Sequence, residues 1–213
     1  MVTLYVEGGG TAGSLKAECR KGFRLFLEAA GLIDDKLRIV ACGSREDTYD
    51  SYCTALHAGK AAILLVDSEA PVSPEAQPGN SSLQADRAKW KPWLHLKQRK
   101  GDGWNKPDGA SDLDCHLMVQ CMEAWLVADP STLKKYFGQS FHEKKLPNAA
   151  NPLELVDKDA LYRALKDATK SCQKGAYGKG KHSFDLLALT DPAKVTQASP
   201  WAQRLIETLQ ETR

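Results

Sequence analysis

The chain has 213 residues, of which 42% are hydrophobic, so it can bury one sizeable core and its length favours a single domain. Its 29 basic and 27 acidic side chains give a formal net charge of +2, which excludes a strong overall field for attracting nucleic acid or membranes. Any site for a polyanion must therefore be local. There is no run of about 18 apolar residues, and the six cysteines lack metal-ligand spacing, so we expect a reduced cytoplasmic protein with no membrane segment.

The first 70 residues follow a βαβαβ order. Runs of β-branched and apolar residues predict strands at 2–6, 37–41 and 61–66. Apolar residues at three- and four-residue spacing predict helices at 15–30 and 47–57. The third strand is apolar throughout, as expected of a parallel strand covered on both faces. This region predicts an α/β fold with a mostly parallel sheet flanked by helices.

Two segments follow this half-sheet. Residues 70–112 are rich in Pro, Gly, Ser, Lys and Trp, which predicts a long insertion with one helix near 86–96. Residues 113–130 return to the core, with a further strand at 116–121. A helix at 122–128 follows that strand directly and is ended by a proline.

Residues 131–213 are predicted to form a mainly helical C-terminal region. Helices are expected at 131–137, with Ser131 as the cap, at 157–172, and twice within 192–212. A glycine-rich basic loop without acidic residues lies at 175–182. In this loop Lys181 is a candidate for offsetting charge on a reacting phosphate, and His182 for binding phosphate or shuttling a proton. A solvated basic loop is an equally good interpretation.

Acidic residues follow two of the predicted strands: Glu7 ends the first, and Asp67 and Glu69 end the third. Ligands of open parallel sheets bind beyond the carboxyl ends of the strands. If the backbone stays extended, Asp67 and Glu69 point to the same side and offer oxygens to Mg²⁺ or Mn²⁺, while Ser68 faces away. A single acid at a strand end is more often simply exposed. The three together predict a metal site, provided that the two strands are neighbours.

Two further features flank this candidate site. Glu123 follows the fourth predicted strand, where it either completes a second metal site or serves as a buried acid at a helix start. Gly8, Gly9 and Gly10 resemble a phosphate-cradling turn ahead of a helix, which makes them candidate cofactor-binding residues. They match neither G-x-x-x-x-G-K-[ST] nor G-x-G-x-x-G, so a nucleotide-binding P-loop is not expected.

The segments Leu4-Tyr5-Val6-Glu7-Gly8 and Leu64-Leu65-Val66-Asp67-Ser68-Glu69 resemble the signature of Toprim domains, which occur in topoisomerases, bacterial primases and OLD-type nucleases. Glu69 stands where many Toprim domains have aspartate, which lengthens that arm by one methylene. Through these segments and residues 38–43, 116–125 and 181–184, the whole chain resembles a bacterial family of small Toprim-like proteins of unknown function. The resemblance implies one Toprim-like Rossmannoid domain over 1–213, with Glu7 as general acid/base or metal ligand and with Asp67 and Glu69 as magnesium ligands.

The function that the resemblance implies is a Toprim-type nuclease, whose one or two Mg²⁺ or Mn²⁺ ions clamp a phosphodiester of nucleic acid. By analogy with OLD-type nucleases, the protein would be the effector of an anti-phage defence module and would have an ATPase as its partner.

Two alternatives remain, a non-catalytic subunit of an ATPase-containing complex and a small-molecule nucleotide phosphohydrolase. The sequence also leaves a homodimer open. Basic and aromatic residues are suited either to binding nucleic acid or to a protein interface: Arg45, Lys97, Arg99, Lys100, Lys106, Trp90, Trp93 and Trp104.

Overall fold

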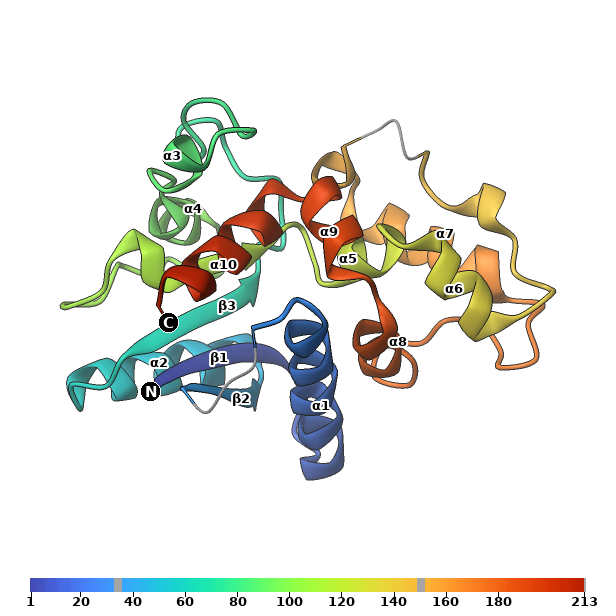
Figure 1. The fold of residues 1–213 in the computed structure, drawn as a ribbon, viewed down its shortest axis with the longest axis horizontal. Helices are drawn as coiled ribbons and strands as arrows, with labels where there is room; N and C mark the ends of the chain where they lie inside the picture. The colour runs from blue at the N-terminus through green and yellow to red at the C-terminus, as the bar shows by residue number, and fades with distance from the viewer. Residues whose placement is uncertain (33–35, 149–151, 213) are drawn as a thin grey trace.

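The computed structural model describes residues 1–32, 36–148 and 152–212. Within them, four parallel strands form one sheet in the order β2-β1-β3-β4 (Figure 1). The strands are β1 (Val2–Gly9), β2 (Leu37–Gly43), β3 (Ala62–Asp67) and β4 (Cys115–Met118). The predicted α/β fold with a parallel, helix-flanked sheet is therefore confirmed, and it is consistent with a Rossmann-like fold.

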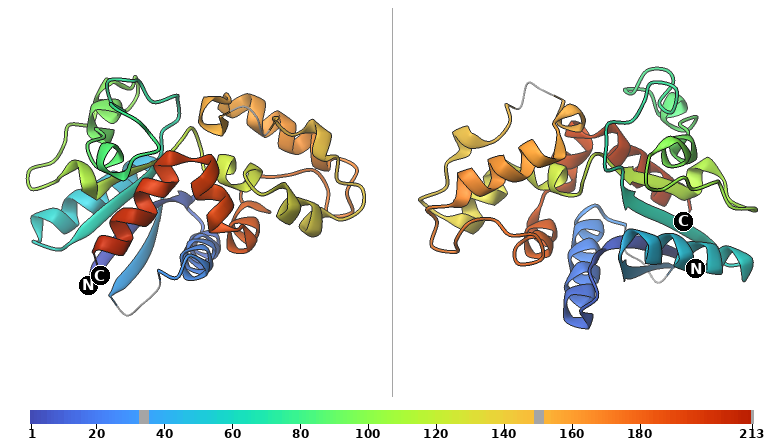
Figure 2. Two further views of the ribbon diagram at one scale, coloured as in Figure 1. Left: turned by 45° about the horizontal axis from the view of Figure 1, so that its top comes forward. Right: turned by 180° about the vertical axis from the view of Figure 1, so that it is seen from behind.

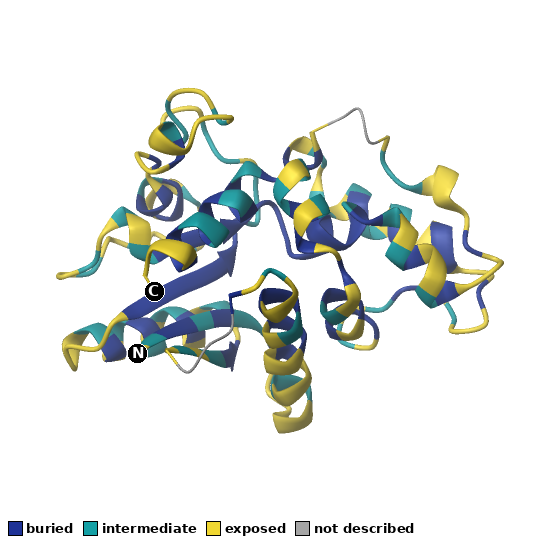
Figure 3. Ribbon diagram, viewed as in Figure 1, coloured by how far each residue is buried: buried dark blue, intermediate teal, exposed yellow. Residues whose placement is uncertain are grey.

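Side chains of the central strands alternate between the two faces of the sheet, and each face has its own hydrophobic core. Leu4 and Leu65 belong to the core that includes the phenylalanines of α1 (Gly13–Ala29). Leu64 belongs to the other core, with Tyr52 of α2 (Arg45–His57). Strand β3 is buried along its whole length (Figure 3). Cover on both faces explains why its sequence is apolar at every position up to its final aspartate.

The insertion at 70–112 carries two short helices instead of the single helix expected, α3 (Gln84–Arg87) and α4 (Pro92–Gln98). Pro92 begins α4, where its missing N–H costs little because the N–H groups of a first helical turn have no partner within the helix. The insertion contributes to the core on the face of α2, where Trp90 packs against Trp201 with ring centroids 4.6 Å apart.

The helices after β4 are α5 (Glu123–Val127), α6 (Pro130–Phe137), α7 (Lys158–Thr169), α8 (Ser183–Leu189), α9 (Pro192–Ala198) and α10 (Pro200–Glu211), so the C-terminal part is helical, as predicted. Helices α6 and α7 lie beyond the carboxyl ends of the strands (Figures 1 and 2). Asp129, and not Ser131, caps α6, because its Oδ1 accepts the N–H of Thr132 at 3.2 Å. Helix α8 was not expected, and it packs along α1. No helix in the described part of the chain is long and apolar enough to cross a membrane. Short 3-10 turns lie at Asp112–Asp114, Glu143–Lys145 and Leu153–Leu155.

Helix α10 returns to the sheet and is anchored by Arg204, which is only 1% exposed. Its Nε donates to the carbonyl of Arg87 at 2.9 Å, and its Nη2 donates to the carbonyl of Asp112 at 2.5 Å. Its Nη1 donates to the carbonyl of Cys115 at 2.8 Å and lies 3.1 Å from Nδ1 of His116. One guanidinium therefore ties the insertion, β4 and the C-terminal helix together.

Candidate metal centre

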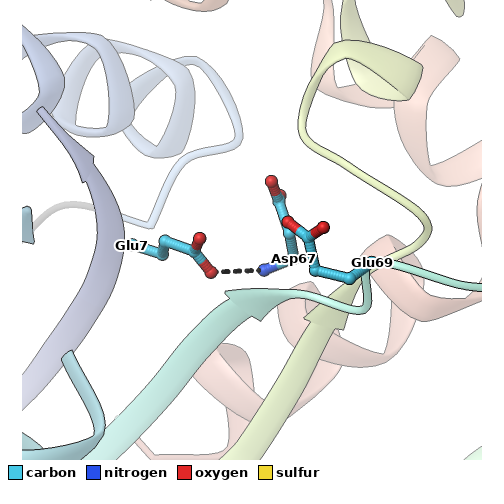
Figure 4. A group of neighbouring side chains, drawn as sticks. All are labelled: Glu7, Asp67 and Glu69. Atoms are coloured by element: carbon cyan, nitrogen blue, oxygen red, sulfur yellow. Dashed lines mark hydrogen bonds between the residues drawn. The ribbon is translucent and has the colours of Figure 1, made fainter. Parts of the chain in front are cut away.

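The carboxylates of Glu7, Asp67 and Glu69 lie together at the carboxyl end of the sheet (Figure 4). Strands β1 and β3 are hydrogen-bonded neighbours, with Val6 opposite Leu65, so their ends bring these side chains to one place. One carboxylate oxygen from each of the three residues lies within 4.8 Å of the others. Such a group of hard oxygen donors suits a cation like Mg²⁺ or Mn²⁺.

The backbone after β3 turns sharply and does not stay extended. Glu69 has φ of 62°, an uncommon conformation for a residue with a side chain, so the condition of an extended backbone is not met. The carboxylates of Asp67 and Glu69 nevertheless reach the same cluster. The N–H groups of Ser68 and Glu69 donate to the carbonyls of Met118 and Gln120 at 2.9 and 2.8 Å. The turn that carries two of the acids is therefore fixed by the segment that leaves β4.

The first two carboxylates are held by backbone donors as well as by their strands. Oε2 of Glu7 accepts the N–H of Asp67 at 3.1 Å, and Oδ1 of Asp67 accepts the N–H of Met122 at 2.8 Å. Asp67 is only 3% exposed. Burial and then the charge of Glu7 raise the pKa of Asp67 well above its usual value, and burial also raises the pKa of Glu7. Negative charge in this cluster is costly, which favours a positively charged partner.

Arg45, the first residue of α2, is the nearest arginine partner of the cluster. Its Nη1 donates to Oε2 of Glu7 at 3.1 Å and also to the backbone carbonyl of Asp67. Its Nε and Nη2 form a two-pronged ion pair with Asp102, at 2.8 and 2.7 Å. The guanidinium lies 4.9 Å from the ring centroid of Trp104. Arg45 thus links the end of β1 to the insertion.

Asp102 of the insertion orients two arginines at once. Besides Arg45 it pairs with Nη1 of Arg99 at 2.7 Å, and the Nη2 of Arg99 lies 3.9 Å from Oε2 of Glu69. The side chain of Asp102 is 3% exposed, and although burial opposes its charge, the two arginines outweigh burial and lower its pKa. Asp102 therefore acts on the cluster indirectly, through the cations that face Glu7 and Glu69.

Removing this carboxylate is expected to weaken metal binding. In Asp102→Ala the two arginines lose their anchor and compete with a metal ion for Glu7 and Glu69, so the affinity for Mn²⁺ should fall by about 10- to 100-fold. Calorimetric titration with Mn²⁺ measures the change. Asp108→Ala, an exposed acid of the same segment, is the matched control. An unchanged dissociation constant in a folded Asp102→Ala variant would contradict this role.

Two lysines from the C-terminal part also face the carboxylate cluster. Nζ of Lys158 pairs with Oε2 of Glu69, and Nζ of Lys179 lies 3.9 Å from Oδ2 of Asp67. Lys179 also donates to the hydroxyl of Tyr162 at 2.9 Å. The glycine-rich loop therefore does bring a lysine to the cluster, but that lysine is Lys179.

The two residues of this loop that the sequence suggested lie elsewhere. Nζ of Lys181 donates to the carbonyl of Lys174 at 3.3 Å. His182 is 3% exposed, and its Nδ1 accepts the N–H of Gly178 at 3.1 Å, next to the ring of Phe137. Burial lowers the pKa of His182. The observed contacts of His182 are those of a neutral side chain that shapes the loop.

Glu123 is fully buried and stands behind the cluster rather than in it. Its Oε1 accepts the hydroxyl of Tyr177 at 2.9 Å, and its Oε2 accepts the hydroxyl of Tyr162 at 3.0 Å. The second tyrosine is the one that holds Lys179. Glu123 is therefore connected to Asp67 through Tyr162 and Lys179, which makes it a support for the lysine.

The glycine run lies against the start of α1. A Cβ at Gly9 would come within 2.7 Å of the backbone of Lys16, and its φ is 90°, so only glycine fits this close approach. Gly8, Gly9 and Gly10 also line a cavity of about 280 Å³ beside Glu7 and Asp67. Their role in binding a cofactor stays a prediction.

Most of the positively charged side chains around the cluster, which are Arg45, Arg99, Lys158 and Lys179, could not be assigned to the site from the sequence pattern. The sequence marks Arg45 only as one of several basic and aromatic residues suited to nucleic acid or to a protein interface, and no motif marks Asp102, Lys158 or Lys179. Lys179 could have been considered, because it belongs to the same glycine-rich loop as Lys181. The others come from segments far apart in the chain.

Fold and site together define an α/β protein with a carboxylate cluster at the mouth of a parallel sheet. The model of the domain of unknown function DUF4276 matches residues 6–210, and the chain belongs to this family. No curated protein and no solved structure matches the chain. The expected membership in a family of unknown function is therefore confirmed, whereas the Toprim relationship stays a prediction.

Proposed function

We propose that this protein carries out metal-dependent hydrolysis of phosphodiesters in nucleic acid, as a Toprim-type nuclease. The observation that carries the proposal is the convergence of Glu7, Asp67 and Glu69, whose oxygens lie within 4.8 Å of one another at adjacent strand ends. Three acids this close repel one another unless a cation joins them. Mg²⁺ and Mn²⁺ accept carboxylate oxygens and bind phosphate at the same time.

The donor set fits such an ion. All three groups are carboxylates, two of them are oriented by backbone N–H donors, and arginine and lysine side chains surround them. Bound there, Mg²⁺ or Mn²⁺ would polarise the phosphate and activate water. Glu7, Asp67 and Glu69 would hold it, with Arg45 and Lys158 giving up part of their present ion pairs.

The remaining chemistry falls to the side chains around the cluster. Hydrolysis adds the oxygen of water to phosphorus and breaks the bond to the leaving sugar oxygen, so water loses one proton and the sugar oxygen gains one. Glu7 is suited to accept the proton through the one of its two carboxylate oxygens that does not bind the ion. Lys179, fixed beside Asp67 by Tyr162, is suited to offset charge on the phosphate.

A small-molecule nucleotide phosphohydrolase is the second candidate. The cavity of about 280 Å³ beside Glu7 and Asp67 favours it, because a cavity of that size suits a small ligand. The same metal chemistry would serve both activities. The substrate panel described next separates them, and an ATPase partner in a defence module stays a proposal by analogy.

The test is cleavage by the purified chain with Mg²⁺, Mn²⁺ or chelator. Substrates should include supercoiled plasmid, linear duplex, single-stranded DNA, RNA and free nucleotides. We expect metal-dependent cleavage of nucleic acid that falls by at least about 100-fold in Glu7→Gln. Glu28→Gln, an exposed acid of α1, should retain full activity.

Full activity of Glu7→Gln would remove the active-site assignment. Turnover of free nucleotides without any cleavage of DNA or RNA would favour the second candidate. No measurable binding of Mn²⁺ by the folded wild-type chain would rule out both.

A further inference from the structure

The cavity beside the carboxylates has one charged end and one apolar side. Glu7, Asp67 and Lys179 form the charged end, whereas Leu15, Met122 and Phe184 contribute apolar surface. Its volume is about 280 Å³. A ligand that matches both parts carries an anionic group on an organic body.

The charged end is built to receive an anion. Nζ of Lys179 is held 2.9 Å from the hydroxyl of Tyr162, which in turn donates to buried Glu123 at 3.0 Å. The side chain of Lys179 is nevertheless 58% exposed, so it remains accessible to a ligand. A cation on the carboxylates and the ammonium of Lys179 would then attract a phosphate from two sides.

The apolar side of the cavity lies next to the carboxylates because Gly8, near the end of β1, has no side chain to separate them. A Cβ at Gly8 would come within 3.0 Å of Sγ of Cys19 and 3.2 Å of Cζ of Phe184. With φ of 135°, this position also disfavours any residue with a side chain. The ring of Phe184 can therefore approach the backbone next to Glu7, which brings an apolar surface close to the charged end.

The volume limits the size of the ligand. About 280 Å³ lies at the lower end of the roughly 300–1,000 Å³ typical of small-ligand pockets, so one nucleotide fits the scale and a duplex does not. A nucleotide inside a duplex would have to leave the stack first, at a cost of a few kcal/mol.

We propose that this cavity binds a single phosphorylated nucleotide unit, with the phosphate between the carboxylate-bound cation and Lys179 and the base or sugar against Leu15, Met122 and Phe184. The proposal rests on the proposed function, because it takes the cation to be bound. It names the substrate as one nucleotide unit, supplied either as a free nucleotide or as the phosphorylated end of a strand.

Titration with AMP, UMP, dAMP and dTMP in the presence of Mn²⁺ tests the proposal, with the binding of Mn²⁺ itself measured separately. Leu15→Trp fills the cavity, and Lys179→Met removes the anchor at an exposed position. Each variant should weaken nucleotide binding by at least about tenfold while the dissociation constant of Mn²⁺ in Leu15→Trp stays within about threefold. Lys166→Met, an exposed lysine of α7, is the matched control and should bind nucleotides like the wild type.

Competition separates the two sources of the nucleotide. A linear oligonucleotide with a terminal phosphate that displaces the mononucleotide, when a covalently closed single-stranded circle does not, identifies a strand end. Displacement only by mononucleotides identifies a free nucleotide. Equal displacement by the closed circle would overturn the proposal.

Failure of the two proposals is distinguishable. If the folded wild-type chain does not bind Mn²⁺, the proposed function is refuted. If Mn²⁺ binds but nucleotides bind no better than inorganic phosphate, or bind unchanged to Lys179→Met, the metal centre stands and the nucleotide cavity is refuted. Thermal unfolding identifies a misfolded Leu15→Trp, in which case Lys179→Met decides.

Discussion

Asp67→Asn is expected to lose Mn²⁺ binding and cleavage by at least about 100-fold while becoming more stable than the wild type in the absence of metal. The side chain keeps its shape, and its Oδ1 can still accept the N–H of Met122. It loses a negative charge that is buried to 3% exposure and repelled by Glu7. The charge needed to bind a cation is thus the charge that destabilises the metal-free fold.

The pH dependence follows from the same cause. Because burial raises the pKa of Asp67 above its usual 3.8, the folded state holds the proton more tightly than the unfolded chain. This stabilising contribution is complete below the unfolded pKa and is lost as the pH rises through the folded pKa. Without metal, the wild type should therefore lose stability across that interval, and Asp67→Asn should lose less.

Thermal unfolding in chelator at several pH values, with and without later addition of Mn²⁺, measures both effects. Asp50→Asn, an exposed acid of α2, serves as the control and should change neither. An Asp67→Asn variant that binds Mn²⁺ like the wild type, or that unfolds earlier without metal, would contradict this account.

Arg204→Met is expected to lower the free energy of unfolding by about 3–5 kcal/mol. Methionine fills much of the space but donates no hydrogen bonds. The carbonyls of Arg87, Cys115 and Asp112 would each lose a buried donor. The loss should appear as an earlier denaturant midpoint, because the insertion, β4 and α10 would no longer share one anchor.

Arg20→Met, an exposed arginine of α1, is the control for removal of the charge alone and should change the free energy by less than about 0.5 kcal/mol. A loss below about 1 kcal/mol in Arg204→Met would show that the buried guanidinium contributes little beyond its volume. Binding of Mn²⁺ by the folded fraction of Arg204→Met should remain, since Arg204 does not contact the carboxylate cluster.

The core of the fold could be predicted because hydrophobic periodicity is a local signal. The buried run that became β3 and the apolar face of α1 are readable from neighbouring residues. Glu7 and Asp67 could be found for the same reason, since each follows an apolar run that predicts a strand, although β1 continues past Glu7 to Gly9 and only Asp67 is the last residue of its strand. Their proximity depends on the strand order, which no local pattern contains and which the sheet order β2-β1-β3-β4 supplies.

The rest of the site depends on contacts between distant segments. Arg45 and Asp102 are 57 positions apart, and Lys158 and Glu69 are 89 apart, so neither pair leaves a periodic trace. The choice of Lys179 over Lys181 depends on how the loop at 175–182 folds over Tyr162. Helix α8 was missed because it has only seven residues and directly follows that loop.

The N–H groups of Ser68 and Glu69 and the Oδ1 of Asp67 all find their hydrogen-bond partners within residues 118–122. All three acids occur within the first third of the chain, yet the scaffold that aims two of them is synthesised much later. A fragment ending at residue 112 would keep every acid and lack the template for their arrangement. Assembly of the cluster must therefore await the fourth strand, and competence to capture a cation should arise late as the chain emerges.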